Sequence, residues 1–215
     1  MTPYYEHAGI TIYHGDCREI SPECELLLTD PPYGIADVWK GGLGHGWGKA
    51  RAESVTRNAW DEAPASTETL QLLVGRSRVA IIWGGNYFAL GPSRCWLVWN
   101  KPERGFSLAE AELAWTNQDA VVRVFDCARS DYGREHPTQK PVRLMSWCLQ
   151  RFDTTGLVLD PYMGSGTTLV AAKALGRQDA PETSGAAAQS QTGAILQGAL
   201  QEGLPGYIAS RGPQH

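Results

Sequence analysis

One stretch of this 215-residue chain constrains its fold more than any other, residues 156–176. An apolar run there ends in the carboxylate of Asp160, a turn with Gly164 and Gly166 follows, and an alanine-rich run continues to Gly176. A short apolar run between turn residues is typical of a buried strand, and glycine commonly ends a helix. The stretch therefore predicts a strand, a turn and a helix, with glycines that let a ligand approach the backbone closely.

Two nucleotide-binding interpretations of this turn fit poorly. A phosphate-binding P-loop has a lysine directly after its second glycine, and Thr167 stands at that position. A dinucleotide fingerprint has a third glycine three residues after Gly166, where this chain has Leu169. Both interpretations are weakened, and the turn must bind its ligand without a phosphate-gripping ammonium.

A second apolar run, residues 25–28, leads to Asp30, Pro31, Pro32 and Tyr33. Two successive prolines each fix φ at about −65° and remove a backbone N–H group, so the turn is stiff. The Asp30 carboxylate and the Pro31 carbonyl are two acceptors beside an aromatic ring. Such a set suits an exocyclic amine on a planar base, which donates two hydrogen bonds and stacks on the ring. The alternative is a strand-ending turn with a core tyrosine.

Two further short motifs bracket these stretches. Residues 136–141 read His-Pro-Thr-Gln-Lys-Pro before a helical pattern over residues 142–152, and a helix start of this kind favours anions. Taken singly, the histidine and lysine of this motif are ordinary surface residues. A weaker Gly-Asp-Cys motif occupies residues 15–17, where Asp16 is about equally well explained as a helix N-cap.

Together these motifs resemble those of the DNA amino-methyltransferases, which methylate N6 of adenine or N4 of cytosine. The resemblance covers roughly residues 9–177. It implies an α/β, Rossmann-like methyltransferase fold with S-adenosylmethionine as cofactor. Because Asp30 precedes Asp160, the motif order is similar to the circularly permuted β group of this family. Residues 81–88 and 112–115 also look like segments of small phage or prophage members.

The resemblance implies roles for individual residues. The aspartate and the first proline carbonyl would bind the amine and the tyrosine would stack on the base, so the catalytic set is Asp30, Pro31, Pro32 and Tyr33. In the family an aspartate in the first position goes more often with adenine, which makes N6 the expected target. Cofactor contacts are implied for Asp16, Cys17, Asp30, His136, Thr138, Lys140, Asp160, Tyr162, Gly164, Ser165, Gly166, Thr167 and Thr168.

Composition favours one catalytic domain and excludes several classes of protein. A formal net charge of −4 does not fit a strong non-specific nucleic-acid binder. The five cysteines are scattered, which argues for reduced thiols in a cytoplasm and against a zinc site. No apolar run approaches the roughly 20 residues of a membrane span. We expect DNA as the partner, with no membrane and no metal, and a homodimer as an option.

Basic charge is concentrated in residues 38–58, where four cations face one acid, Glu53. The stretch is also rich in glycine and has two tryptophans. It is typical of a loop that closes over nucleic acid and a flipped base, although a solvated loop whose tryptophans fill the core is almost as good an explanation. Residues 37–60 and 101–135 are the candidate DNA-recognition loops, with phosphate contacts expected from Lys40, Lys49, Arg51 and Arg57.

Strands alternate with helices along the predicted catalytic domain, residues 1–177. This pattern predicts a single, largely parallel sheet flanked by helices, with ligands beyond the carboxyl ends of the strands. Strands are expected near residues 10–13, 25–29, 78–83, 95–99, 120–125 and 156–159, and helices near 66–75, 142–152 and 167–175.

Residues 178–215 depart from the family, which continues with a β-branched strand whose terminal acid binds the cofactor ribose. Here Gly, Ala, Gln and Ser dominate, and Pro181 separates the candidate acids Asp179 and Glu182. We expect a divergent tail, flexible or weakly helical, that adds no strand and weakens cofactor binding. Two alternatives to an active DNA methyltransferase follow. One is a degenerate homologue that binds DNA or cofactor without turnover, and the other is an RNA or protein amide methyltransferase.

Overall fold

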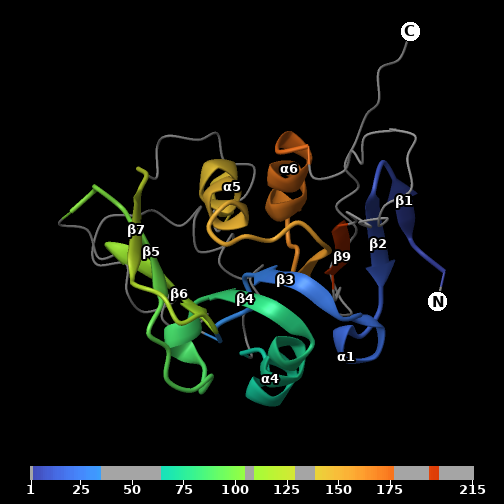
Figure 1. Cartoon of the computed structure of the whole chain (residues 1–215), viewed down its shortest axis with the longest axis horizontal. Coiled ribbons are helices and arrows are strands. Elements are labelled where there is room, and N and C mark those ends of the chain that lie inside the picture. The colour runs from blue at the N-terminus through green and yellow to red at the C-terminus, as the bar shows by residue number, and fades with distance from the viewer. Residues whose placement is uncertain (1, 35–63, 105–108, 129–138, 177–193, 199–215) are drawn as a thin grey trace, which may run out of the picture.

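The computed structural model describes residues 2–34, 64–104, 109–128, 139–176 and 194–198. These residues form a nine-stranded sheet in the order β1-β2-β9-β8-β3-β4-β6-β5-β7, with helices on both of its faces (Figure 1). The predicted fold class, a largely parallel α/β sheet, is confirmed. Among the described helices, none is both long and apolar enough to cross a membrane.

Five parallel strands form one half of the sheet. They are β2 (Ile10–His14), β9 (Ala194–Gly198), β8 (Val158–Asp160), β3 (Cys24–Thr29) and β4 (Ser77–Trp83). Leu26, Leu27 and Leu28 of β3 are all buried. Consecutive buried residues mean that both faces of this strand are covered, which explains why its sequence is a continuous apolar run instead of an alternating one.

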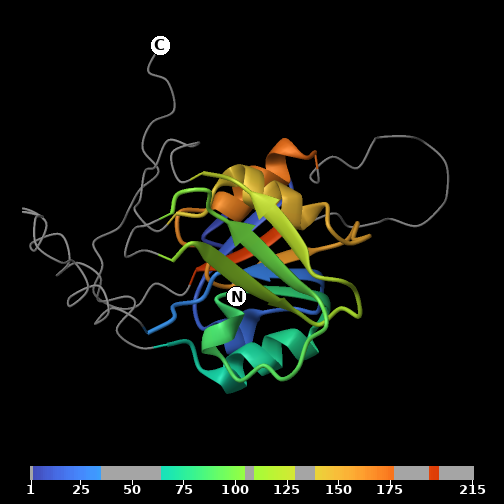
Figure 2. The ribbon, with the colours of Figure 1, turned by 90° about the vertical axis from the view of Figure 1, so that its left-hand side faces the viewer.

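Helices cover the two faces separately, as the side view in Figure 2 shows. On one face, α5 (Val142–Leu149) and α6 (Thr167–Ala174) pack with Leu26 and Leu28. On the other, α1 (Cys17–Ile20) and α4 (Thr67–Gly75) pack with Leu27. Ser66 caps α4 by accepting a hydrogen bond from the backbone of Thr69 at 3.1 Å, which fixes where the helix begins.

The other half of the sheet is mixed. β6 (Ala111–Thr116) runs antiparallel to both β4 and β5 (Trp96–Asn100), and β7 (Arg123–Asp126) pairs in parallel with β5 at the edge. A short β1 (Tyr5–His7) pairs antiparallel with β2, and the 3₁₀ turn η3 (Gly85–Tyr87) follows β4. The predicted ranges overlap the other described strands and helices, although the strand predicted at 120–125 begins only at Arg123. The elements α1, β1, β6 and β9 fall outside the predicted ranges.

β9 corrects one expectation, that residues 178–215 add no strand. Residues 194–198 pair in parallel with β2 on one side and with β8 on the other. This pairing satisfies backbone groups that would otherwise form two open strand edges inside the sheet. The prediction was wrong because it looked for the strand directly after Gly176, whereas residues 177–193 intervene. The short apolar pair Ile195 and Leu196 was the available signal.

Candidate active site

The two predicted carboxylate turns meet at one edge of the sheet. Asp30 directly follows β3 and Asp160 is the last residue of β8, and these strands are parallel neighbours. The carboxyl ends of neighbouring parallel strands lie at the same edge, which is where ligands bind in open α/β sheets. The two motifs therefore come together at the carboxyl ends of β3 and β8.

Asp30 is held from both sides of its carboxylate. The Tyr33 hydroxyl donates to Oδ1, and the Lys140 ammonium donates to Oδ2 at 2.7 Å. Lys140 Nζ also donates to the Tyr33 hydroxyl oxygen at 3.2 Å. The Asp30 side chain is 27% exposed, whereas that of Lys140 is only 6% exposed. The acceptor is thus accessible from outside, and the cation that fixes it is not.

Lys140 is not the surface lysine that its motif alone suggested. Burial lowers the pKa of its ammonium, but the charges of Asp30 and Glu112 outweigh that effect and raise the pKa well above the ordinary value. Burial and the neighbouring Asp30 likewise raise the pKa of Tyr33 well above its ordinary value. Lys140 is therefore cationic and Tyr33 neutral around pH 7, so each can donate a hydrogen bond.

Two charged residues that the sequence interpretation missed complete this cluster. Glu112 on β6 is 3.1 Å from Lys140 Nζ through Oε2, and its Oε1 is paired with Lys101, which follows β5. Burial would raise the pKa of Glu112, but the two ammonium groups lower it to about 2. A glutamate within the otherwise apolar stretch 111–115 was the only sequence signal for this role.

The Tyr33 ring is stacked on another aromatic ring in this structure. Its centroid lies 5.0 Å from that of Tyr87 with an interplanar angle of 14°, and Phe88 packs edge-on at 6.3 Å. A Cβ at Gly84 would come within 2.0 Å of Tyr33 Cε1, and Gly84 has a left-handed φ of +67°. Glycine is thus required at this position both for its conformation and to admit the tyrosine ring.

Asp160 has a different environment. It is 3% exposed and accepts hydrogen bonds from the Thr29 hydroxyl at 2.8 Å and from the Tyr162 backbone at 3.2 Å, with the Thr168 side chain as a further partner. Burial raises its pKa to about 6, although these hydrogen bonds partly offset the effect. Because Thr29 immediately precedes Asp30, this carboxyl group connects the two turns.

The glycine turn after β8 leaves its backbone open. Gly164 and Gly166 have φ of +51° and +78°, and Gly164 and Ser165 are exposed at the start of α6. A Cβ added at Gly164 would meet no atom closer than 4.0 Å, so space beside this turn is available to a ligand. The Ser165 and Thr167 hydroxyls are 3.1 Å apart. This geometry fits the cofactor turn that the sequence predicted.

Asp16 caps α1, as the alternative interpretation of its motif proposed. Its carboxylate accepts from the Arg18 backbone at 2.9 Å and is also paired with the Arg18 guanidinium, which lowers the Asp16 pKa to about 2. The neighbouring Cys17 is buried, and its thiol is hydrogen-bonded with the Tyr162 side chain. The N-terminal motif therefore lies beside the glycine turn.

Several predicted site residues lie outside the described part of the chain. They are His136, Thr138, Lys40, Lys49, Arg51 and Arg57, together with the whole of loop 37–60 and parts of loop 101–135. Among the described residues, no group of three histidine, cysteine, aspartate or glutamate side chains could hold a metal ion.

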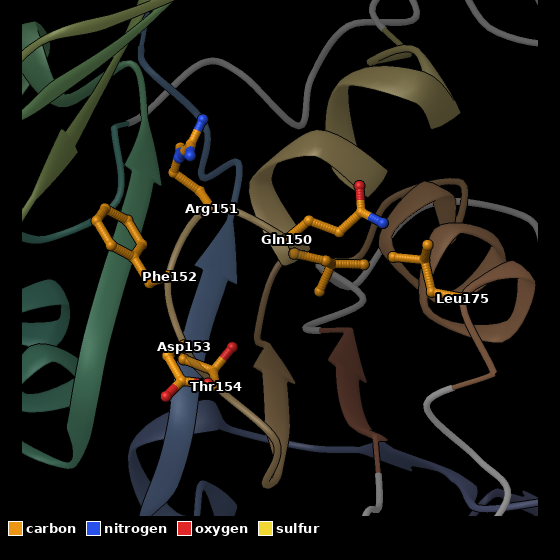
Figure 3. A pocket seen from close by; sticks show the side chains of 7 residues that line it. Gln150, Arg151, Phe152, Asp153, Thr154 and Leu175 are labelled. Atoms are coloured by element: carbon orange, nitrogen blue, oxygen red, sulfur yellow. The ribbon is translucent and has the colours of Figure 1, made fainter.

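A hollow of about 470 Å³ lies elsewhere on the molecule (Figure 3). Residues 149–154, which form most of its lining, connect the end of α5 to β8, and Leu175 closes it from the end of α6. It therefore lies near the amino end of β8, at the edge opposite Asp160, and is separate from the candidate active site.

Comparison with known proteins agrees with this geometry. The family model described as DNA methylase, for N6 and N4 methyltransferases, matches residues 92–196. The chain is also 24% identical over 233 aligned positions to the type II methyltransferase M2.LlaDCHI of Lactococcus lactis subsp. cremoris, covering 82% of this chain and 85% of that protein. Both matches are to DNA methyltransferases, so the chain is similar to this DNA methylase family. The resemblance predicted from its motifs is confirmed.

Solved structures share the fold of this chain. The M1.HpyAVI–SAM complex is 18% identical in sequence with a TM-score of 0.51. The match covers 90% of this chain and 94% of the M1.HpyAVI chain. The PvuII DNA methyltransferase, which is cytosine-N4-specific, is 13% identical with a TM-score of 0.54. The match covers 92% of this chain and 84% of the PvuII enzyme. Both likenesses extend over nearly the whole chain.

Proposed function

We propose that this methylase transfers a methyl group from S-adenosylmethionine to N6 of a flipped adenine in DNA. The observation that carries the proposal is the meeting of two turns at one sheet edge. One holds the accessible, firmly held carboxylate of Asp30, and the other is a glycine turn that is open at Gly164 and Ser165. One turn suits an exocyclic amine, and the other suits a ligand that lies against backbone. The Thr29–Asp160 hydrogen bond fixes their separation.

Asp30 would act as a preorganised acceptor for the amine. The lone pair of an aromatic amine is delocalised into the ring, so acceptors that bind its N–H hydrogens and favour tetrahedral geometry make the nitrogen more nucleophilic. A carboxylate has about four lone-pair sites. Tyr33 and Lys140 occupy two of them. Capacity remains for an amine hydrogen, and the Pro31 carbonyl would accept the other.

Tyr33 would stack on the flipped base. Its ring now faces Tyr87, which is 50% exposed and lies in the three-residue turn η3. We propose that the base takes the place of Tyr87, because the two stacked rings have the same parallel geometry that a base and a tyrosine adopt. Tyr33 itself is anchored through its hydroxyl and stays in place.

The cofactor would be held by residues around the glycine turn. Tyr162, Gly164, Ser165 and Thr167 line or shape the turn, and Asp16 and Cys17 lie beside it. S-adenosylmethionine supplies an electrophilic methyl group when bound. DNA would be held by loops 37–60 and 101–135, whose basic residues suit phosphate contacts.

Adenine is preferred over cytosine because of the aspartate at the first motif position, Asp30. Incubation of purified protein with DNA and tritiated S-adenosylmethionine, followed by nucleoside mass spectrometry, tests the proposal. N6-methyladenine is the expected product. If N4-methylcytosine forms instead, the target base in the proposal is wrong but the reaction is right. If label appears only in RNA or protein, DNA is not the substrate. Cofactor binding without label in any of the three would identify a degenerate homologue.

A further inference from the structure

The charges around Asp30 form a chain of alternating sign. Lys101 pairs with Glu112, Glu112 pairs with Lys140, and Lys140 pairs with Asp30. The antiparallel pairing of β5 with β6 places Trp99 opposite Glu112 and Asn100 opposite Ala111. Lys101 and Glu112 are therefore diagonal neighbours at the end of the two strands, and their side chains pair. The chain of charges therefore connects this strand pair to the candidate acceptor.

Glu112 completes the coordination of the Lys140 ammonium. An ammonium has three N–H donors. Three acceptors surround Lys140 Nζ: Asp30 Oδ2 at 2.7 Å, Glu112 Oε2 at 3.1 Å and the Tyr33 hydroxyl at 3.2 Å. With each donor matched to one acceptor, the ammonium is held against rotation and against a shift toward Asp30 alone.

We propose that Glu112 is a positioning residue for methyl transfer, which, anchored by Lys101, fixes Lys140 and through it the orientation of the Asp30 carboxylate. This inference rests on the proposed function, in which Asp30 accepts the amine. Without Glu112, the buried ammonium would move onto Asp30 and occupy acceptor sites that the amine needs. Glu112 itself touches neither base nor cofactor in this account.

The pairing is permanent under working conditions. The two ammonium groups hold the pKa of Glu112 at about 2, so it stays ionised throughout the neutral range. Glu112 thus has a constant effect on Lys140 and does not act as a pH switch. Its loss should lower the rate at all pH values near neutrality.

The test compares Glu112→Gln and Glu112→Asp with the wild type and with Glu110→Gln as a matched control. Glu110 is two residues away and exposed, and its nearest cation is Arg104 at 3.7 Å. Misplacement of a catalytic group by about 1 Å can cost a hundredfold, so kcat should fall about 10- to 100-fold in Glu112→Gln. Glu112→Asp keeps the charge with a shorter reach and should lie between. Cofactor affinity by calorimetry should not change, and Glu110→Gln should match the wild type.

A double variant separates positioning from a general structural effect. If Glu112 acts through Lys140, Glu112→Gln combined with Lys140→Met should be no slower than Lys140→Met alone. Additive losses would overturn the inference, and so would a wild-type kcat in Glu112→Gln. If Glu112→Gln does not fold, a wild-type kcat in Glu112→Asp overturns it instead. If the wild type transfers no methyl group, both the proposed function and this inference are overturned. If the wild type is active and the Glu112 variants are unaffected, this inference alone is overturned.

Discussion

Asp30 and Asp160 end neighbouring strands, yet their surroundings differ in almost every respect. Asp30 is partly exposed and bound by a cation, whereas Asp160 is buried and bound by hydroxyl and backbone donors. Burial among neutral donors favours the protonated carboxyl group of Asp160 and raises its pKa. One strand-end aspartate is therefore partly open to solvent beside a cation, and the other connects two turns.

The largest expected effect is on Asp30. Asp30→Asn keeps the shape but removes the charge, and loss of one preorganised transition-state interaction costs about a hundredfold or more in rate. Single-turnover methyl transfer should show this loss, and circular dichroism should show an intact fold. Asp160→Asn is the matched variant on the neighbouring strand and should lose much less rate. Equal losses in the two variants would break the distinction between the two aspartates.

A second effect concerns stability and pH at Asp160. Its folded pKa of about 6 exceeds the ordinary value of 3.8, so the unfolded chain releases this proton first as pH rises. The wild-type free energy of unfolding should therefore fall between about pH 4 and pH 6 because of this group, a loss of about 3 kcal/mol when complete.

Asp160→Asn should lack that fall, since its amide oxygen can still accept from Thr29 and from the Tyr162 backbone but cannot ionise. Urea unfolding at pH 4 and pH 7 measures the free energy of unfolding of both proteins. Relative to the wild type, the variant should be more stable at pH 7 than at pH 4. If the free energy of unfolding changes equally with pH in the two proteins, folding does not raise the pKa of Asp160.

Tyr33 sharpens the comparison on the Asp30 side. Tyr33→Ala should lose about 1–3 kcal/mol of base stacking, seen as a higher KM for DNA. Tyr33→Phe keeps the ring but loses the hydroxyl that donates to Asp30 and accepts from Lys140. Because the stacking face remains, Tyr33→Phe should lose less activity than Tyr33→Ala. Tyr87→Ala should not raise the KM, because it removes the ring that the base displaces. Equal damage from Phe and Ala at position 33 would make the hydroxyl, not the ring face, the functional part.

The smallest effect is expected in the glycine turn on the Asp160 side. Gly166→Val forces a β-branched residue into a left-handed backbone at a cost of about 1–2 kcal/mol or more, whereas asparagine tolerates this conformation. Calorimetry should therefore find weaker S-adenosylmethionine binding in Gly166→Val than in Gly166→Asn. Unchanged binding in both variants would leave the turn a purely structural connection.

The sequence by itself determined the central strands, the main helices and the two carboxylate turns. Continuous apolar runs such as residues 26–28 are buried on both faces, and alanine-rich or capped segments form helices through local propensity and hydrogen bonds. The motifs also indicated the resemblance to DNA amino-methyltransferases. These signals are local, so they can be identified in the sequence without knowledge of the tertiary contacts.

Only the tertiary structure decided which residues surround Asp30. Lys140 lies 110 residues from Asp30 in sequence, and nothing near it predicts that its ammonium is buried between two carboxylates. Glu112 and Lys101 are ordinary charges until β5 pairs with β6 beside β4. The same holds for residues 194–198. Their strand signal is weak in the sequence, and they form a strand because the backbone groups of β2 and β8 need hydrogen-bond partners. Ion pairs and sheet edges depend on distant neighbours, and their energies appear only once the chain has folded.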